Sequence, residues 1–338
     1  MVSLQDIRAA AGRIGGAVWR TPLIPASLPP GSPSGGTGAR IWLKCENLQR
    51  ICAFKARGAY NFVSRVPAGT RAKGLITYSS GNHAQAVAFA ARSFGVSALI
   101  TMPDDAPGIK RRATEALGAT VEFAGTTSES RRLRAEEILD EEGGVMVPPF
   151  DHPDIIAGQG TVGLEICEQA EALANRLDEQ SPAGPDVVLV PIGGGGLAAG
   201  VSTAVKALRP EARVIGVEPE AADAMRRSIR QGSVVTLDSA NTVADGLKPL
   251  RPGDLTFAHC RALLDEVATV TDEQILSAVG WLHRRRLVVE PSGAATVAAV
   301  LGGAAPSATA AAAAGGQVVA VLSGGNIEPT LLADVIAR

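Results

Sequence analysis

The chain has 338 residues, of which 46% are hydrophobic and 20% charged, and its formal net charge is −2. This length suggests about two domains, and the near-neutral charge with few aromatic residues excludes a polyanion-binding surface, so no nucleic acid partner is expected. No apolar run is long enough to span a membrane and the first residues lack the apolar core of a signal peptide, so we expect a cytoplasmic protein with no membrane partner.

Short apolar runs alternate with helical patterns along most of the chain. The runs that predict strands are 74–79, 97–102, 120–123, 187–191, 213–219, 266–270 and 317–323. The patterns that predict helices cover 54–63, 83–94, 109–117 and 129–142, and others start near 197, 223 and 271. Strands rich in Val, Ile and Leu between helices are typical of parallel sheets covered on both faces. We therefore expect an α/β fold with open, twisted, mostly parallel sheets covered by helices.

The alternation is interrupted near residues 69–74 and again near residue 150. These interruptions predict a large domain made of residues 1–73 and 152–338, with a small domain of residues 74–151 inserted into it. Two further segments, 27–39 and 302–316, are rich in turn-forming or small residues. We expect both of them to be loops.

Lys55 stands among apolar and small residues in the segment ICAFKARGAY. If residues 54–63 form a helix, Lys55, Ala59 and Phe62 share one face of it. Burial disfavours the charged ammonium and lowers its pKa, which turns a lysine into a nucleophile able to form a Schiff base. The ordinary alternative is a lysine whose stem packs while its charged end reaches water.

Four glycines, Gly193 to Gly196, lie between a predicted strand and a predicted helix in VVLVPIGGGGLAAG. Backbone N–H groups at the start of a helix bind phosphate. The same stretch also fits a dinucleotide-binding pattern that runs from Gly193 to Ala198, with Glu218 where a ribose-binding acid would stand. A phosphate-bearing cofactor and a nicotinamide nucleotide are both open at this point.

Two polar turns follow other predicted strands. The first, in SSGNHAQAVAFAA, precedes a helix, and its N–H groups and hydroxyls suit a carboxylate, although Ser80 or Asn82 could also be an ordinary N-cap. The second, in VLSGGN, ends a strand at the place where parallel sheets bind ligands. Pyridoxal phosphate accounts for all four features, because it needs an amine, a phosphate-binding loop and a ring-nitrogen partner, and its amino acid substrate needs a carboxylate site.

The motifs together resemble the fold-type-II pyridoxal-phosphate enzymes, specifically the threonine/serine dehydratase and serine racemase family, whose fold is tryptophan synthase β-like. The resemblance covers nearly the whole chain. The matching segments are RTPL, KCENLQRICAFKARGAYN, SSGNHAQAVAFAA, PPFDHPDIIAGQGTVGLEI, PIGGGGLAAG, GVEPEAADA, TVADGL, VVEPSGAA and LSGGN, all in the family's order. It implies pyridoxal 5'-phosphate as the cofactor and disfavours the nicotinamide reading.

The resemblance also implies a role for each matched residue. Lys55 would hold the cofactor and move the substrate's Cα proton, and Ser80 would lie on the opposite face of the cofactor. The residues implied to contact the cofactor are Phe54, Lys55, Asn82, Gly193, Gly194, Gly195, Gly196, Leu197, Glu290 and Ser323. Those implied to surround the substrate are Ser79, Ser80, Gly81, Asn82, His83 and Gly246.

The resemblance implies β-elimination of a small β-hydroxy amino acid, L-threonine or L-serine, to a 2-oxo acid and ammonia. It places this reaction in amino acid metabolism, including isoleucine biosynthesis. Ser323 beside the ring nitrogen would leave that nitrogen largely neutral, which favours prompt loss of the β-hydroxyl over transamination. The alternative is a serine racemase or a threo-3-hydroxyaspartate dehydratase that uses Ser80 as a second base. A non-catalytic binding protein on this fold is a further reading.

The sequence departs from the family pattern at two places. Cys52 stands where members commonly carry glycine or another small residue, and a thiol so near Lys55 could oxidise or tune the site. Racemase-like members bind a divalent cation at a segment that reads EPEAADA here, where Glu218 and Ala222 remain but the second acidic ligand is Ala224. Only a weak metal site is therefore expected.

The chain ends soon after the LSGGN segment. The resemblance therefore implies no C-terminal regulatory domain and no inhibition by isoleucine. It also implies a homodimer or a homotetramer, since both occur in the family.

Overall fold

The computed structural model describes residues 1–33, 39–79, 81–104, 106, 108–126, 128–177 and 184–337. Among these residues the strands form two separate sheets, one in the order β1-β2-β10-β7-β8-β9 and one in the order β5-β4-β3-β6. Their bounds are β1 Leu23–Ser27, β2 Arg40–Cys45, β3 Leu75–Tyr78, β4 Ala98–Met102, β5 Thr120–Phe123, β6 Val145–Met146, β7 Val187–Pro191, β8 Arg213–Pro219, β9 Glu266–Val270 and β10 Val318–Leu322. All neighbouring strands are parallel except β1 and β2. The expected α/β fold is confirmed.

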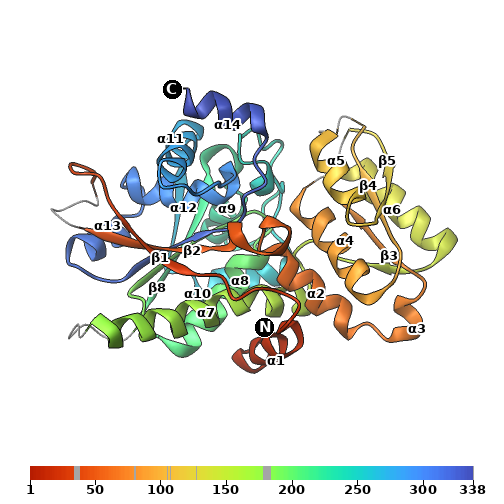
Figure 1. Ribbon diagram of the computed structural model, residues 1–338, viewed down its shortest axis with the longest axis horizontal. Coiled ribbons are helices and arrows are strands. Elements are labelled where there is room, and N and C mark those ends of the chain that lie inside the picture. Colours follow the sequence, from red (N-terminus) through yellow and green to blue (C-terminus); the bar gives the residue numbers. More distant parts are fainter. Residues whose placement is uncertain are drawn as a thin grey trace.

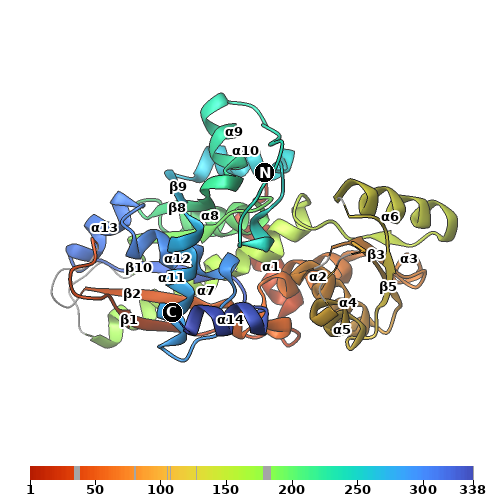
Figure 2. The same ribbon diagram turned by 90° about the horizontal axis from the view of Figure 1, so that it is seen from above.

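Helices cover both sheets (Figures 1 and 2). The α-helices are α1 Leu4–Ile14, α2 Lys55–Arg65, α3 Ala68–Arg71, α4 Asn82–Phe94, α5 Gly108–Glu115, α6 Ser128–Glu142, α7 Pro153–Leu177, α8 Gly196–Leu208, α9 Ala224–Gln231, α10 Asp254–Leu263, α11 Asp272–His283, α12 Pro291–Leu301, α13 Pro306–Ala313 and α14 Pro329–Ile336. The 3-10 helices are η1 Glu46–Leu48, η2 Arg50–Cys52, η3 Glu220–Ala222 and η4 Asp245–Leu247.

Strand β7 shows why a continuous apolar run forms the centre of the large sheet. Val187 and Leu189 belong to the core that includes α11 and α12, whereas Val188 and Val190 belong to the core that includes α7 and α8. Successive side chains of a strand point to opposite faces, and all four are buried. The large sheet is therefore covered on both faces, as its apolar runs predict.

The small sheet and its helices form the right-hand lobe of Figure 1. Helix α6 packs Ala135 and Ile138 against Ile76 of β3, and α4 covers the other face. The division into a large domain (1–73 and 152–338) and an inserted domain (74–151) stays a prediction. Helix α2 lies between the two lobes and packs against both α7 and α4.

Glycines let α2 approach α7 very closely. A Cβ atom added to Gly158 would lie 2.6 Å from the Cα of Gly58, and one added to Gly58 would lie 2.3 Å from the amide nitrogen of the Gln159 side chain. No ordinary side chain fits at such distances, so glycine is required on both helices. The close contact seats α2 firmly, and α2 begins at Lys55.

One expectation was wrong. Residues 302–316 were expected to form a loop, but α13 occupies Pro306–Ala313. Alanine has the highest helix propensity, and proline suits the first turn of a helix, so the Ala-rich composition favours this helix. In the other expected loop, 28–33 lies outside regular structure and 34–38 lies outside the described residues.

Within the described ranges no single helix is long and apolar enough to cross a membrane. Taken together, α12 and α13 have the length and apolar composition of a membrane-spanning segment, but a bend of 63° separates the two helices.

Candidate active site

Lys55 is the first residue of α2 and follows an unusual turn. Ile51 and Cys52 have φ angles of 55° and 53°, in the left-handed region that glycine occupies easily and other residues rarely adopt. Beyond the turn, the Phe54 amide donates a hydrogen bond of 3.1 Å to the carbonyl of Ser323. The chain therefore enters α2 held against the end of β10.

The Lys55 ammonium faces main chain rather than a carboxylate. Its Nζ donates a hydrogen bond of 2.5 Å to the carbonyl of Pro149 and lies 5.3 Å from the centre of the Phe54 ring. Loss of hydration lowers the pKa of Lys55 from 10.5 to about 8. A substantial fraction of neutral amine, which is the nucleophilic form, is then present near physiological pH.

The glycine loop follows β7 and leads into α8. Gly195 has a φ of 96°, which favours glycine, and an added Cβ on Gly194 would lie 2.3 Å from the Phe150 ring. The first N–H groups of a helix lack acceptors within the helix, and its N-terminus carries a partial positive charge. The loop therefore presents the kind of anion site that the sequence predicts, with the main chain passing close to Phe150.

The Ser-Ser-Gly-Asn-His turn joins β3 to α4. Ser79 accepts a hydrogen bond of 3.3 Å from the Gly81 amide, and Gly81 is the N-cap of α4 without any side-chain cap. Asn82, the first residue of α4, instead donates through Nδ2 to Glu290 Oε1 at 2.6 Å. The ordinary N-cap reading therefore does not apply to Asn82, while Ser80 lies outside the described residues.

His83 lies behind this turn rather than at its surface. The ring is buried, and its Nε2 is 3.0 Å from the carbonyl oxygen of Val147. Burial, and then the nearby Lys55 charge, lower the pKa of His83 from 6.5 to about 3. The imidazole is therefore neutral at ordinary pH.

Glu290 immediately precedes α12 and is buried beside the end of β10. An added Cβ on Gly324 would lie 2.1 Å from Glu290 Oε1 and 3.1 Å from Asn82 Nδ2, so the Ser-Gly-Gly-Asn turn packs closely against both side chains. Burial, and then the Asp245 carboxylate, raise the pKa of Glu290 from 4.5 to about 7. Ser323, also buried, directly follows the end of β10.

Gly246, which lies in η4, is the last of the predicted site residues. Its amide donates 2.8 Å to Ser292 Oγ, and a Cβ on Gly193 would lie 2.8 Å from its carbonyl oxygen. The neighbouring Asp245 pairs with Lys110 of α5, which links the two lobes.

Contacts among the predicted residues form a closed ring. From Lys55 the ring passes through Pro149 and Phe150 to the glycine loop, then through Gly246 and Ser292 to α12. It returns through Glu290, Asn82 and the Ser-Gly-Gly-Asn turn to Phe54. Segments that are far apart in the sequence are therefore gathered at one place.

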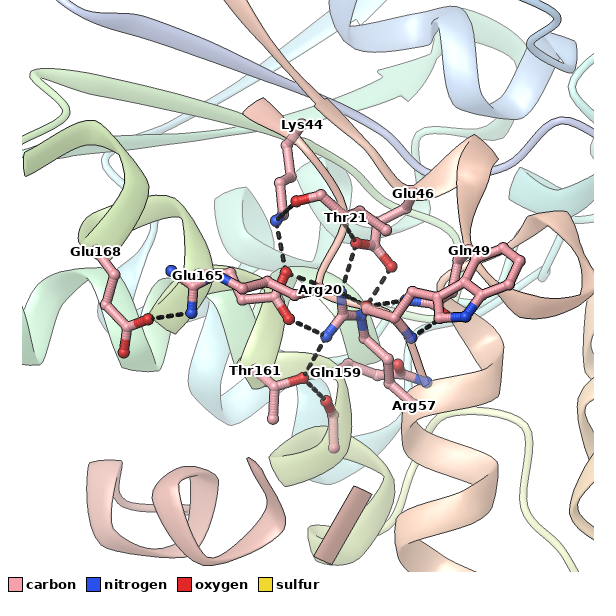
Figure 3. A network of polar contacts seen from close by, with 12 residues as sticks. Arg20, Thr21, Lys44, Glu46, Gln49, Arg57, Gln159, Thr161, Glu165 and Glu168 are labelled. Carbon is pink, nitrogen blue, oxygen red and sulfur yellow. Dashed lines mark hydrogen bonds and ion pairs between the residues drawn. The ribbon is translucent and has the colours of Figure 1, made fainter. Parts of the chain in front are cut away.

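Sequence reasoning missed a buried ionic cluster beside this ring (Figure 3). Arg57 donates to both oxygens of Glu46, at 2.8 Å each, and to Glu165 of α7 at 2.7 Å. Lys44 of β2 donates to Glu165 at 2.5 Å. Arg57 and Lys44 are fully buried, and the two cations balance the two carboxylates. Because Arg57 is one half-turn after Lys55, the cluster fixes the start of α2 against the large sheet.

The expected weak metal site at Glu218 and Ala222 finds no support in the geometry. Both carboxylate oxygens of Glu218 accept hydrogen bonds of 2.9 Å, from the amides of Met225 and Arg226, at the start of α9. Burial raises the pKa of Glu218 to about 8. Within the described part of the chain, no three His, Cys, Asp or Glu side chains gather as a metal site. The same two hydrogen bonds turn Glu218 away from a ribose-binding role.

This α/β architecture with a lysine, a glycine loop and a polar strand-end turn defines the class of pyridoxal-phosphate enzymes. The family model described as "Pyridoxal-phosphate dependent enzyme" matches residues 14–324, so the chain belongs to that family. The predicted pyridoxal phosphate dependence is thereby confirmed.

Curated relatives and a solved structure match along nearly the whole chain. The L-threo-3-hydroxyaspartate ammonia-lyase of Saccharomyces cerevisiae is 38% identical over 98% of this chain and 95% of its own length. The L-threonine ammonia-lyase of Thermotoga maritima is 40% identical over 100% of this chain and 79% of its own. The structure of maize serine racemase aligns with a TM-score of 0.86 and 34% identity, covering 99% of this chain and 97% of that one. These comparisons confirm the fold-type-II resemblance.

Proposed function

We propose that this protein is an ammonia-lyase that removes water and then ammonia from L-threonine or L-serine. The observation that carries the proposal is Lys55, an amine with a lowered pKa that lies in one ring of contacts with a glycine loop and a polar turn at a helix start. The relatives are named for activities on L-threo-3-hydroxyaspartate, L-threonine and serine. All three are small β-hydroxy amino acids, which supports the same substrate class.

The residues present fit pyridoxal phosphate. Glycines 193 to 196 provide bare backbone at the start of α8 for a phosphate, and an added Cβ on Gly194 or Gly196 would lie within 3.1 Å of Phe150. Lys55 Nζ, which bonds the carbonyl of Pro149 next to Phe150, would hold the cofactor covalently. When bound, the cofactor supplies a carbonyl carbon that amines attack and a conjugated ring that withdraws electrons.

The remaining residues of the ring would orient the bound molecules. Asn82 and Glu290 would lie beside the cofactor, Phe54 would pack against it and Ser323 would face its ring nitrogen. The Leu197 amide would join the phosphate-binding loop. Ser79, Ser80, Gly81 and Asn82 would surround the substrate carboxylate, with His83 buried behind them and Gly246 also lining the pocket. The neutral state of His83 supports a role in shaping this turn rather than in charging it.

One proton position follows for the reaction. Lys55, once its amine is neutral, would accept the Cα proton at Nζ, which its lowered pKa allows near neutral pH. The β-hydroxyl would leave with one proton as water, which balances the proton removed from Cα, and addition of a second water would hydrolyse the remaining enamine to the 2-oxo acid and ammonia. The overall change needs no oxidant or reductant. Ser323, a neutral partner, would not hold a proton on the ring nitrogen, which favours elimination over transamination.

The assay that tests this proposal measures 2-oxo acid release from L-threonine, L-serine and L-threo-3-hydroxyaspartate by the loaded wild-type protein. We expect release from at least one of them, and none from Lys55→Ala. Release from none of the three by a protein with bound cofactor would contradict the proposal.

A racemase is the second candidate, because the maize serine racemase aligns over nearly the whole chain. Ser80 would be its second base. Chiral analysis of L-serine incubations separates the two activities, since Ser80→Ala should abolish D-serine and spare 2-oxo acid release. We further propose that the protein is cytoplasmic and forms a homodimer or a homotetramer. Sedimentation of the purified protein would measure its oligomeric state.

A further inference from the structure

The turn before Lys55 lies alongside the Ser-Gly-Gly-Asn segment, residues 323–326. The Gly325 amide donates 2.8 Å to the carbonyl of Cys52, and the Asn326 side chain donates through Nδ2 at 2.9 Å to the carbonyl of Ile51. Ala53 and Gly324 pair as an antiparallel bridge. Every residue from 51 to 54 is therefore held by this one segment.

The held turn is strained. Ile51, a β-branched residue, and Cys52 both have left-handed φ angles, a conformation that costs an L-residue roughly 1–2 kcal/mol. Such backbone persists only where surrounding groups fix it, and it concentrates at functional sites. Among the described residues, Asn326 supplies the one side-chain hydrogen bond to the first of these two strained residues.

The same Asn326 amide group also holds Asn82. Its Nδ2 donates 2.7 Å to Asn82 Oδ1, which directs Asn82 Nδ2 to Glu290 Oε1. An amide can turn over and exchange its donor and acceptor ends unless a neighbour distinguishes them. Asn326 makes that distinction at the oxygen end of Asn82, because its Nδ2 can only donate, and Glu290 accepts from the nitrogen end.

We propose that Asn326 is a positioning residue that couples the turn delivering Lys55 to the orientation of the Asn82 amide. Through these two bonds it keeps Asn82 Nδ2 on the side of Glu290, where the proposed function places the cofactor, while it stabilises the strained entry to α2. This inference rests on the proposed function, since it assigns Lys55 and Asn82 to the cofactor. Asn326 itself touches neither cofactor nor substrate in this account.

Two substitutions separate the contributions. Asn326→Asp has the same shape but cannot donate, so Asn82 turns over to offer Nδ2 to the new carboxylate and presents Oδ1 toward the cofactor. Asn326→Ser is neutral and keeps one hydroxyl donor for one of the two acceptors. We expect the dissociation constant for pyridoxal phosphate to rise on the order of tenfold in N326D and less in N326S.

A pH titration of the visible absorption band of the loaded protein supplies a readout that a merely structural role would not move. Loss of the Asn82 donor destabilises negative charge on the cofactor's 3-oxygen, so the midpoint should move to higher pH in N326D. In N326S one hydroxyl cannot serve both acceptors, so we expect a smaller shift in the same direction without any added charge.

The matched control is Asn47→Asp. Asn47 lies against Gly325 and donates 3.1 Å to the carbonyl of Val288, but it bonds neither the 51–52 turn nor Asn82. We expect N47D to keep the wild-type cofactor affinity and titration midpoint, whatever stability it loses to urea. Unchanged affinity and midpoint in both Asn326 variants, or an equal change in N47D, would overturn the inference. Wild-type protein that binds no pyridoxal phosphate would instead overturn the proposed function on which it rests.

Discussion

Asn82 and Glu290, which stand 208 residues apart, are joined by a hydrogen bond of 2.6 Å from Nδ2 to Oε1. One residue starts the first helix after β3 and the other immediately precedes α12, so this bond connects the small and large lobes at the site. Because Glu290 is buried and faces Asp245, its pKa is raised to about 7, and its charge depends on pH in the physiological range.

This raised pKa predicts a pH-dependent stability. Between pH 4.5 and about 7 the folded protein keeps a proton on Glu290 that the unfolded chain has released, so the free energy of unfolding falls as pH rises through that window. Glu290→Gln removes this dependence, on the order of 3 kcal/mol at most. Urea unfolding of the cofactor-free protein at about pH 5 and about pH 8 measures it. An equal pH dependence in wild type and E290Q would contradict the assignment.

Cys52 occupies a left-handed position, which gives a direct physical reason for glycine there. Cys52→Gly should raise the free energy of unfolding by about 1 kcal/mol, because relief of strain exceeds the added entropy of the unfolded chain. Cys52→Ala removes the thiol but keeps the strain, and should not stabilise. The comparison uses urea unfolding of the three proteins. A gain in C52A equal to that in C52G would assign the effect to the thiol instead.

Gly194 has no room for a side chain, since a Cβ would lie 2.3 Å from Phe150. Gly194→Ala should therefore cost about 1–3 kcal/mol of stability and weaken pyridoxal phosphate binding. Gly12→Ala in α1 is the control, because no atom lies within 4 Å of its added Cβ. That change should stabilise by about 0.5–1 kcal/mol and leave cofactor titration unaltered. Wild-type cofactor affinity in G194A would exclude this loop as the phosphate site.

Arg57 is fully buried and holds two carboxylates, the buried Glu46 and the mostly buried Glu165. Arg57→Lys cannot reproduce the forked hydrogen bonds and should cost about 3–5 kcal/mol. The exposed pair of Arg20 and Glu168, at a similar 2.6 Å, offers a control, and Arg20→Lys should cost less than about 1 kcal/mol. Thermal or urea unfolding gives both values. Similar costs at the two sites would mean that burial does not decide the contribution of Arg57.

The sequence was sufficient to predict the elements whose apolar period is regular. Strand 187–191 and the helix from about 271 to 285 correspond closely to β7 and α11, because burial on two faces or one face imposes those periods. The pairing of β1 with β2 at the sheet edge and the helix α13 were not predicted. Edge strands have weak hydrophobic patterns. An Ala/Gly-rich composition is compatible with a loop as well as with a helix.

The site was predictable as a set of motifs but not as an arrangement. Lys55, Asn82 and Ser323 each follow a recognisable local pattern, whereas the role of Asn326 depends on a carbonyl that lies 275 residues away. The burial of Arg57 likewise depends on partners from other elements, whereas its charge alone would suggest an exposed position on the surface. Long-range hydrogen bonds leave no local signal in a single sequence.

If Lys55 carries the cofactor, reduction of the loaded protein with borohydride attaches a pyridoxyl group to its amine. Digestion and mass spectrometry then locate that group among the chain's lysines. We expect a single labelled peptide, the one containing Lys55, whose amine has a pKa lowered to about 8. A label on Lys44, Lys110 or another lysine, or no label on a protein that binds the cofactor, would contradict it.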